Sequence, residues 1–128
     1  MRNVGVRGFT LIELLIVVVI IGILAAIAIP KFGATKERAY IAAMKSDLRN
    51  MATAQDGYLF DNQVYTTAFT TGVFRLSAGV STYTVAATTG GWMATVAHEQ
   101  TNVKCYIFGG SAYTANGPAT REGTAACQ

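Results

Sequence analysis

The sequence has few of the side chains from which most catalytic and metal sites are built. It contains one histidine, His98, and two cysteines, Cys105 and Cys127, in 128 residues. His98 lies in a predicted strand with only Glu99 beside it, and neighbours in a strand point to opposite faces, so no nucleophile and base come together. No second ligand stands at a metal-binding spacing from His98. We therefore expect no enzyme, no metal and no cofactor.

Motifs for binding phosphate or nucleic acid are also absent from the sequence. The glycine pairs at 90–91 and 109–110 lack the lysine and the helix start that a phosphate-binding loop needs. Basic and aromatic residues do not cluster into a nucleic-acid footprint. We therefore expect no specific nucleic-acid partner.

The sequence does contain one long apolar run, from Phe9 to Ile29, in which Glu13 is the single ionisable side chain. At about 1.5 Å per residue this run makes a helix of roughly 30 Å, which is about the thickness of the hydrocarbon core of a bilayer. The hydrophobic share of 52% and the mean hydropathy of +0.35 are high because the run is included. The remainder, about a hundred residues, is long enough for one small soluble domain.

Basic residues flank the apolar run on both sides. Arg2 and Arg7 precede it, and Lys31, Lys36 and Arg38 follow it, as is typical of segments that meet lipid headgroups. The formal charge of +3 comes from ten Lys and Arg against seven Asp and Glu. Without the two leading arginines the count is eight against seven, or +1. The rest of the chain is therefore nearly neutral.

The order of these features differs from that of a secretory signal peptide, whose cleavage site follows its apolar region. Here the small residue at the junction between polar and apolar sequence is Gly8, which lies before the run. Cleavage after Gly8 would therefore keep the apolar helix in the mature protein.

Residues 8–13, GFTLIE, followed by the apolar run and Pro30, resemble the leader-peptidase motif of type IV pilins and of the related pseudopilins. The resemblance covers residues 1 to about 30. It implies that a prepilin peptidase cleaves between Gly8 and Phe9, and that the new amino group of Phe9 is methylated. The alternative is a generic signal anchor that carries Glu13 by accident.

Glu13 needs a partner whether or not the resemblance holds. An ionised carboxylate at the centre of a membrane helix costs about 2.5–3.5 kcal/mol, and less toward the helix ends. Cleavage would give Phe9 a free amino group at the positive end of the helix dipole. That group is about one turn from Glu13 of the same chain, whereas a contact between neighbouring helices would also set their register. We expect Glu13 of one subunit to pair with the Phe9 amine of another during assembly, and the resemblance implies the same pairing.

Gly22 and Pro30 interrupt the helical pattern. Pro30 has no amide hydrogen, so it bends or loosens a helix. The resemblance implies a helix break, with extended or melted backbone between the two residues in the assembled filament. The alternative is a simple kink where the helix leaves the bilayer.

From Lys31 the pattern becomes that of an amphipathic helix, which we expect to end between Gly57 and Asn62. Its predicted buried face carries residues spaced by three and four: Ile41, Met44, Leu48, Met51, Gln55 and Tyr58. Lys45, Asp47, Arg49 and Asn50 fall largely elsewhere. This face should pack on the soluble domain.

Strand patterns follow a polar connecting loop. Residues 81–87 and 92–98 are rich in β-branched and aromatic residues and flank a Thr-Thr-Gly-Gly turn, so they predict a hairpin. A third strand is expected at 103–108 and a short edge strand at 73–76. The fold class is therefore α+β, with a long N-terminal helix, membrane-spanning in its first half and amphipathic in its second, packed on an antiparallel sheet of three to four strands.

Cys105 and Cys127 flank a distal loop of low charge. If this part reaches an oxidising compartment, a disulfide between them can persist and would stabilise the domain by about 3 kcal/mol; the alternative is two free thiols. The resemblance also suggests a C-terminal disulfide-bounded loop, which in the family often governs adhesion. No binding motif lies inside this loop, so a tail that is merely fastened by the disulfide is the safer interpretation.

The predicted organisation has four parts. They are a cleaved leader at 1–8, a membrane and filament-core helix at 9–30, an amphipathic helical half at 31–60, and a distal part at 61–128 with the connecting loop, the sheet and the C-terminal loop. The resemblance implies a major pilin that forms a type IV pilus for adhesion, twitching motility or DNA uptake. The alternatives are a pseudopilin of a type II secretion system and a minor pilin that acts as tip adhesin or DNA receptor. The expected disulfide, and the lack of an acidic C-terminal cluster able to hold calcium, favour a pilin.

The resemblance also implies partners and a location. The precursor would lie in the bacterial inner membrane with a cytoplasmic leader and a periplasmic sheet domain, and the assembled pilus would be extracellular. Its partners would be other copies in a helical filament, a prepilin peptidase, an assembly ATPase with its platform protein, and an outer-membrane secretin.

Overall fold

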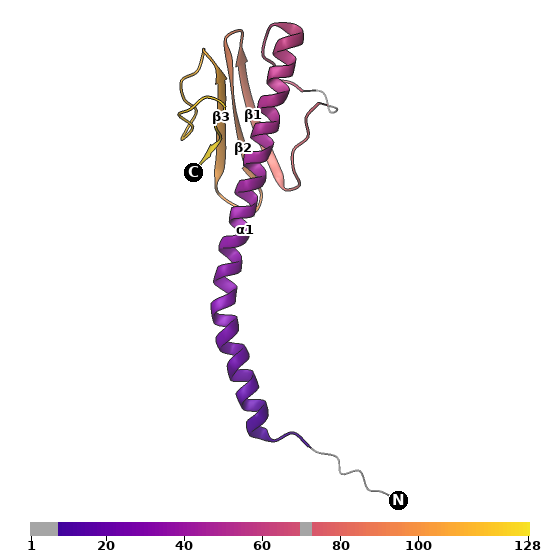
Figure 1. Ribbon diagram of the computed structural model, residues 1–128, viewed down its shortest axis with the longest axis vertical. Helices are drawn as coiled ribbons and strands as arrows, with labels where there is room; N and C mark the ends of the chain where they lie inside the picture. The colour runs from indigo at the N-terminus through magenta and orange to yellow at the C-terminus, as the bar shows by residue number, and fades with distance from the viewer. Residues whose placement is uncertain (1–7, 70–72) are drawn as a thin grey trace, which may run out of the picture. The chain divides into compact units, whose positions relative to one another are not determined.

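The protein consists of one helix followed by a four-stranded antiparallel sheet, as seen in a computed structural model that describes residues 8–69 and 73–128 (Figure 1). The elements are α1 (Leu11–Asn62), β1 (Val80–Thr88), β2 (Gly91–His98), β3 (Lys104–Gly110) and β4 (Ala126–Cys127). This confirms the predicted α+β class. The chain divides into two compact units, Met1–Lys36 and Glu37–Gln128, and α1 passes through both.

In the first unit the most apolar stretch of the helix is not covered by other described residues of the chain. No residue of its 18-residue window of highest hydropathy is buried. Its length and composition alone are sufficient for one membrane span. An apolar surface of this size requires cover, from lipid or from other protein.

The helix continues through Gly22 and Pro30 without interruption. A side chain added at Gly22 would meet no atom within 4 Å, so no packing inside the chain requires glycine there. In the single subunit, therefore, neither residue ends the helix. The predicted loss of helix between them concerns the assembled filament and stays a prediction.

The helix ends at Asn62, inside the predicted range, and the reason is local. Gln63 adopts a positive φ of 61° and its amide N–H donates to the carbonyl of Leu59 at 2.8 Å. The Asn62 side chain donates to the carbonyl of Tyr58 at 3.1 Å. The left-handed conformation of Gln63 turns the chain out of the helix, and the bond to Leu59 closes the last turn.

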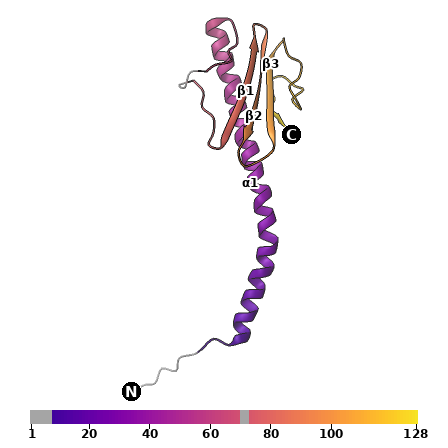
Figure 2. The same cartoon turned by 180° about the vertical axis from the view of Figure 1, so that it is seen from behind.

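In the second unit the helix lies along one face of the sheet (Figures 1 and 2). The hydrophobic core of this unit is formed by residues of both elements. The predicted helical face supplies Met44, Leu48 and Met51, all fully buried, while Tyr58 at its end remains 37% exposed. The sheet contributes alternate residues of β2 and β3, namely Trp92, Ala94, Val96, Cys105 and Ile107. This two-residue period is the one expected of strands with one face against a helix.

The sheet is a meander in the order β1-β2-β3-β4. β1 and β2 form the predicted hairpin, and β3 pairs antiparallel with β2 in a register that places Gly109 opposite Trp92. An added side chain at Gly109 would approach Nε1 of Trp92 to 2.6 Å, so the indole occupies the space that the glycine leaves. The register therefore depends on this close approach.

The fourth strand is not the predicted one. Residues 74–77 form no strand, and β3 pairs instead with β4, where Cys105 lies opposite Cys127. The prediction for residues 73–76 was wrong because this segment is bound to the helix and not to a strand edge. Ser77 donates from its amide and its hydroxyl to the Asp47 carboxylate at 2.9 and 2.7 Å.

Two polar residues of the helix thus attach the connecting loop. Besides Asp47, the buried Gln55 donates to the carbonyl of Thr66 at 2.6 Å and accepts from the amide of Thr66 at 3.0 Å. Asp47 is only 2% exposed, although the sequence pattern placed it off the buried face. Both side chains are buried because they replace the hydrogen bonds that the loop backbone would make to water.

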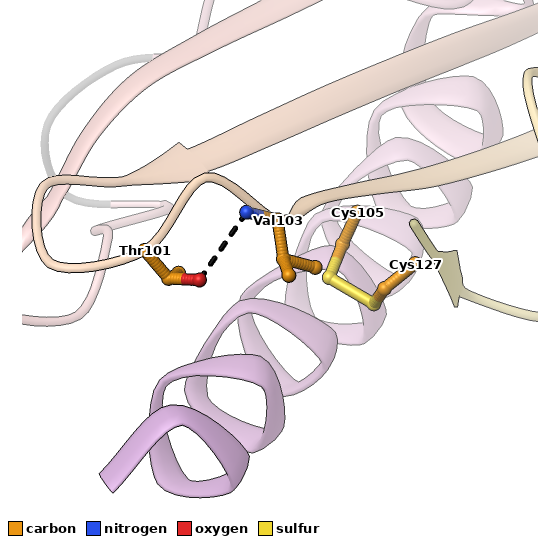
Figure 3. The surroundings of a disulfide bond; sticks show 4 residues. All are labelled: Thr101, Val103, Cys105 and Cys127. Atoms are coloured by element: carbon orange, nitrogen blue, oxygen red, sulfur yellow. Dashed lines mark hydrogen bonds between the residues drawn. A yellow bond between two sulfur atoms is a disulfide. The ribbon is translucent and has the colours of Figure 1, made fainter. Parts of the chain in front are cut away.

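A disulfide joins Cys105 in β3 to Cys127 in β4, as the sequence predicts (Figure 3). Beside it, the Thr101 hydroxyl accepts a hydrogen bond from the amide of Val103 at 3.2 Å (Figure 3). The segment between β3 and β4 is attached at further points. The Asn116 side chain donates to the carbonyls of Ala94 and Ile107 at 2.9 and 3.0 Å. The tail is therefore a packed part of the domain.

Candidate assembly site at the start of the helix

The residues that the sequence marks as the cleavage site lie just before α1. Residues 8–10 have no regular secondary structure, and α1 begins at Leu11. Phe9 is 85% exposed, and a side chain added at Gly8 would meet no atom within 4 Å. The peptide bond between Gly8 and Phe9 is thus outside the helix and uncovered by the rest of the described chain.

Thr10 and Glu13 form a capping box at the first turn. Thr10 is the N-cap residue, because its carbonyl accepts the first helical bond, from the amide of Leu14 at 3.3 Å. Its hydroxyl accepts the amide N–H of Glu13 at 3.3 Å. In return the Glu13 carboxylate accepts the Thr10 amide at 2.8 Å and the Thr10 hydroxyl at 2.7 Å. This reciprocal arrangement satisfies two amides that a helix start otherwise leaves without partners.

Both bonds to the carboxylate end on the same oxygen. Oε2 of Glu13 accepts from Thr10 twice, and Oε1 accepts from no group within residues 8–69 and 73–128. Phe9 is still joined to Gly8, so its nitrogen is an amide and cannot act as the expected cationic partner. In the uncleaved chain Glu13 is therefore paired with Thr10.

The sequence reasoning considered only the amine as a partner for Glu13 and missed Thr10. A signal was present, since Thr-x-x-Glu directly before an apolar run is the pattern of a capping box. A capping box involves only residues three positions apart, so the sequence pattern alone was sufficient to find it.

Beyond the cap, the helix is apolar on all sides. The large side chains from Leu14 to Leu24 are between 46% and 62% exposed, with no polar face among them. A helix that is apolar all round is stable only inside a membrane or among other protein segments. Gly22, Ala25, Ala26 and Ala28 add small side chains that allow close helix packing.

His98 packs inside the second unit. It is 6% exposed, its ring stacks on Tyr40 with centroids 4.2 Å apart, and its Nδ1 accepts the amide of Gln100 at 3.1 Å. Within the described residues no three His, Cys, Asp or Glu side chains come together in a group that could hold a metal ion. The single histidine thus packs the junction between the helix and the end of β2.

Comparison with known proteins places the N-terminal segment in a defined family. Residues 5–29 match the family described as the prokaryotic N-terminal methylation motif. The chain is 45% identical over 58 residues to the type II secretion system core protein G of Pseudomonas aeruginosa, covering 45% of this chain and 41% of that protein. It is 51% identical over 59 residues to the type IV major pilin of Myxococcus xanthus, covering 46% and 27%.

A third relative is the type IV wide pilus major component of Thermus thermophilus, which is 47% identical over 66 residues, covering 52% of this chain and 49% of that protein. In each case the match spans less than half of the relative's length. The methylation motif, the relatives and the observed helix-and-sheet architecture agree. Over its N-terminal half the chain is therefore similar to members of the type IV pilin superfamily, whose pilins and type II secretion pseudopilins are structural subunits and not enzymes.

Proposed function

We propose that this chain is a major pilin, which polymerises through the apolar part of α1 into a type IV pilus. The observation that supports this most is the combination at the helix start. An apolar helix with no internal cover begins with a capped carboxylate, directly after an exposed Gly8–Phe9 bond. A membrane anchor alone needs the apolar helix but not the carboxylate, whereas a subunit that must find its neighbours in register needs both.

The proposed maturation starts at Gly8. A prepilin peptidase removes residues 1–8 as a leader, and the amino group of Phe9 becomes methylated. Residues 9–30 then form the membrane segment and later the filament core, 31–60 the amphipathic half of the helix, and 61–128 the outer domain. The precursor lies in the inner membrane with a cytoplasmic leader and a periplasmic sheet, and the filament leaves the cell with the help of an assembly ATPase, a platform protein and a secretin.

The proposed assembly step pairs Glu13 of one subunit with the Phe9 amine of the next. An ion pair in a nonpolar surrounding is much stronger than in water, and leaving either charge without its partner there is costly. The pair therefore favours one stagger between neighbouring helices over others that bury the same apolar area. Apolar contact supplies most of the attraction, and the ion pair supplies the register.

A pseudopilin is the second candidate, because the type II secretion system core protein G of Pseudomonas aeruginosa is among the relatives. Its filament would serve protein secretion. The disulfide between Cys105 and Cys127, which fastens the C-terminal segment to the sheet, is the observation that favours the pilin. The described residues contain no cluster of three or more acidic side chains that could bind a calcium ion.

The first experiment is electron microscopy of sheared surface filaments with mass spectrometry of their main subunit. Long filaments composed chiefly of this chain and beginning at a methylated Phe9 are the expected result. Absence of the chain from such filaments, together with loss of protein secretion when its gene is deleted, would establish the pseudopilin instead.

The second experiment replaces Glu13 by Val. We expect the variant to be cleaved and inserted normally but to give few or no filaments. Inside the subunit the carboxylate contacts only Thr10 of the first turn, whereas the proposed pairing between subunits depends on its charge. The amount of cleaved subunit in the membrane and the amount of sheared filament are measured in parallel. Normal filament yield from Glu13→Val would refute the proposed pairing.

A further inference from the structure

We propose that Thr10 is a positioning residue for assembly, which holds the Glu13 carboxylate so that one oxygen is left for the amino group of a neighbouring subunit. This inference rests on the proposed pairing between Glu13 and the Phe9 amine of another copy. It assigns a role to a residue that the pairing alone does not involve.

The geometry of the cap is the basis of the proposal. The amide and the hydroxyl of Thr10 both donate to Oε2 of Glu13, at 2.8 and 2.7 Å. Oε1 receives no hydrogen bond from the described residues, and the Glu13 side chain is exposed. A carboxylate has acceptor capacity on both oxygens. It can therefore keep its bonds to Thr10 through Oε2 while Oε1 accepts the N–H of an incoming amine.

The cap also removes a cost of pairing. A glutamate side chain that is free to rotate must lose that freedom when it binds a partner, and this loss weakens binding. Here Thr10 restricts Glu13 before any neighbour arrives, so the loss is incurred on folding of the first turn. Before assembly the subunit lies in the membrane, where water does not supply hydrogen-bond donors to the carboxylate. There the same two bonds from Thr10 supply these donors.

The hydroxyl of Thr10 is suited to this role because one oxygen serves both directions. It accepts the Glu13 amide at 3.3 Å and donates its own hydrogen to Oε2. Serine has the same hydroxyl, whereas valine keeps the branched shape of threonine without it. The two substitutions thus separate the hydroxyl from the shape of the side chain.

The test compares Thr10→Val, Thr10→Ser and Glu13→Val in the full-length chain, expressed in cells from which the native gene is deleted. The readout is sheared filament divided by cleaved subunit in the membrane, so that any effect on cleavage or insertion cancels. We expect Thr10→Val to lower this ratio about tenfold, the usual size of the loss of one hydrogen bond to a charged group. Thr10→Ser should remain close to wild type.

Each other outcome decides against the inference. A normal ratio in Thr10→Val, with Glu13→Val unable to assemble, overturns the role of Thr10 and leaves the proposed pairing intact. A normal ratio in Glu13→Val overturns the pairing and the inference together. An equal loss in Thr10→Val and Thr10→Ser shows that the hydroxyl is not responsible. A lower amount of cleaved Thr10→Val subunit at an unchanged ratio assigns Thr10 to processing.

Discussion

The two parts of α1 have the same secondary structure and opposite surroundings. Up to Lys36 its large apolar side chains are exposed, from 46% at Val17 to 84% at Leu11. In the unit that begins at Glu37, Met44 and Leu48 are completely buried against the sheet. Hydrophobic residues of the second part stabilise the fold of the subunit, whereas those of the first part have no partner in the described chain. Cover for these side chains must come from lipid or from other protein.

The largest expected effect is the difference between truncating a leucine in the second part of α1 and truncating one in the first part. Leu48→Ala should lower the free energy of unfolding of the sheet domain by about 2–5 kcal/mol, because it leaves a cavity in the core. Leu15→Ala, at a position that is 54% exposed, should leave this free energy unchanged. Thermal unfolding of the full chain in detergent, followed by near-ultraviolet circular dichroism, measures both. Equal destabilisation by the two variants would contradict the separation of roles.

The next effect concerns the disulfide. Replacing Cys105 and Cys127 together by Ser should lower the free energy of unfolding of the sheet domain by about 3 kcal/mol, since the bond closes a loop with a sequence separation of 22. The double substitution avoids leaving one reactive thiol. Insertion into the membrane should not change, because α1 up to Lys36 does not contain the bond. Denaturant unfolding with and without reductant gives the comparison, and a wild-type protein insensitive to complete reduction would be inconsistent with it.

The smallest of the three effects tests the buried carboxylate that holds the connecting loop. Asp47→Ala leaves the amide and the hydroxyl of Ser77 without their acceptor and should lower the free energy of unfolding by about 1–3 kcal/mol. Asp56→Ala removes an exposed carboxylate from the same helix and should change this free energy by less than about 0.5 kcal/mol. Urea unfolding distinguishes them. Similar values for the two variants would show that the loop does not depend on Asp47.

The sequence was a good guide to some elements and a poor one to others. The helix end near Asn62, the hairpin of β1 and β2 and the strand β3 follow from local periodicity and turn residues, and all were predicted. The edge strand at 73–76 was not found, since its β-branched and aromatic residues do not reveal that Ser77 binds Asp47. Asp47 was placed off the buried face for the same reason: burial of a carboxylate depends on a partner that is distant in sequence.

The helix start illustrates a different limit. The residues GFTLIE were recognised as a processing motif, and Glu13 was assigned an intermolecular partner, but its bonds to Thr10 were overlooked. A carboxylate has two oxygens, and assigning one partner does not account for both. The Thr-x-x-Glu pattern predicts the contact between Thr10 and Glu13. Only the folded structure shows that both hydrogen bonds from Thr10 end on the same carboxylate oxygen.

The amino-acid sequence was enough to predict the apolar helix long enough to span a membrane, the N-terminal motif GFTLIE and the succession of strands. These features depend on composition and on spacing over a few residues, which a linear chain records directly. The three-dimensional arrangement was needed to learn that β4 closes the sheet through Cys127, that Asp47 and Gln55 hold the loop, and that Oε1 of Glu13 stays available. Each of these depends on which polar atoms meet after folding, and a linear pattern does not specify such pairings.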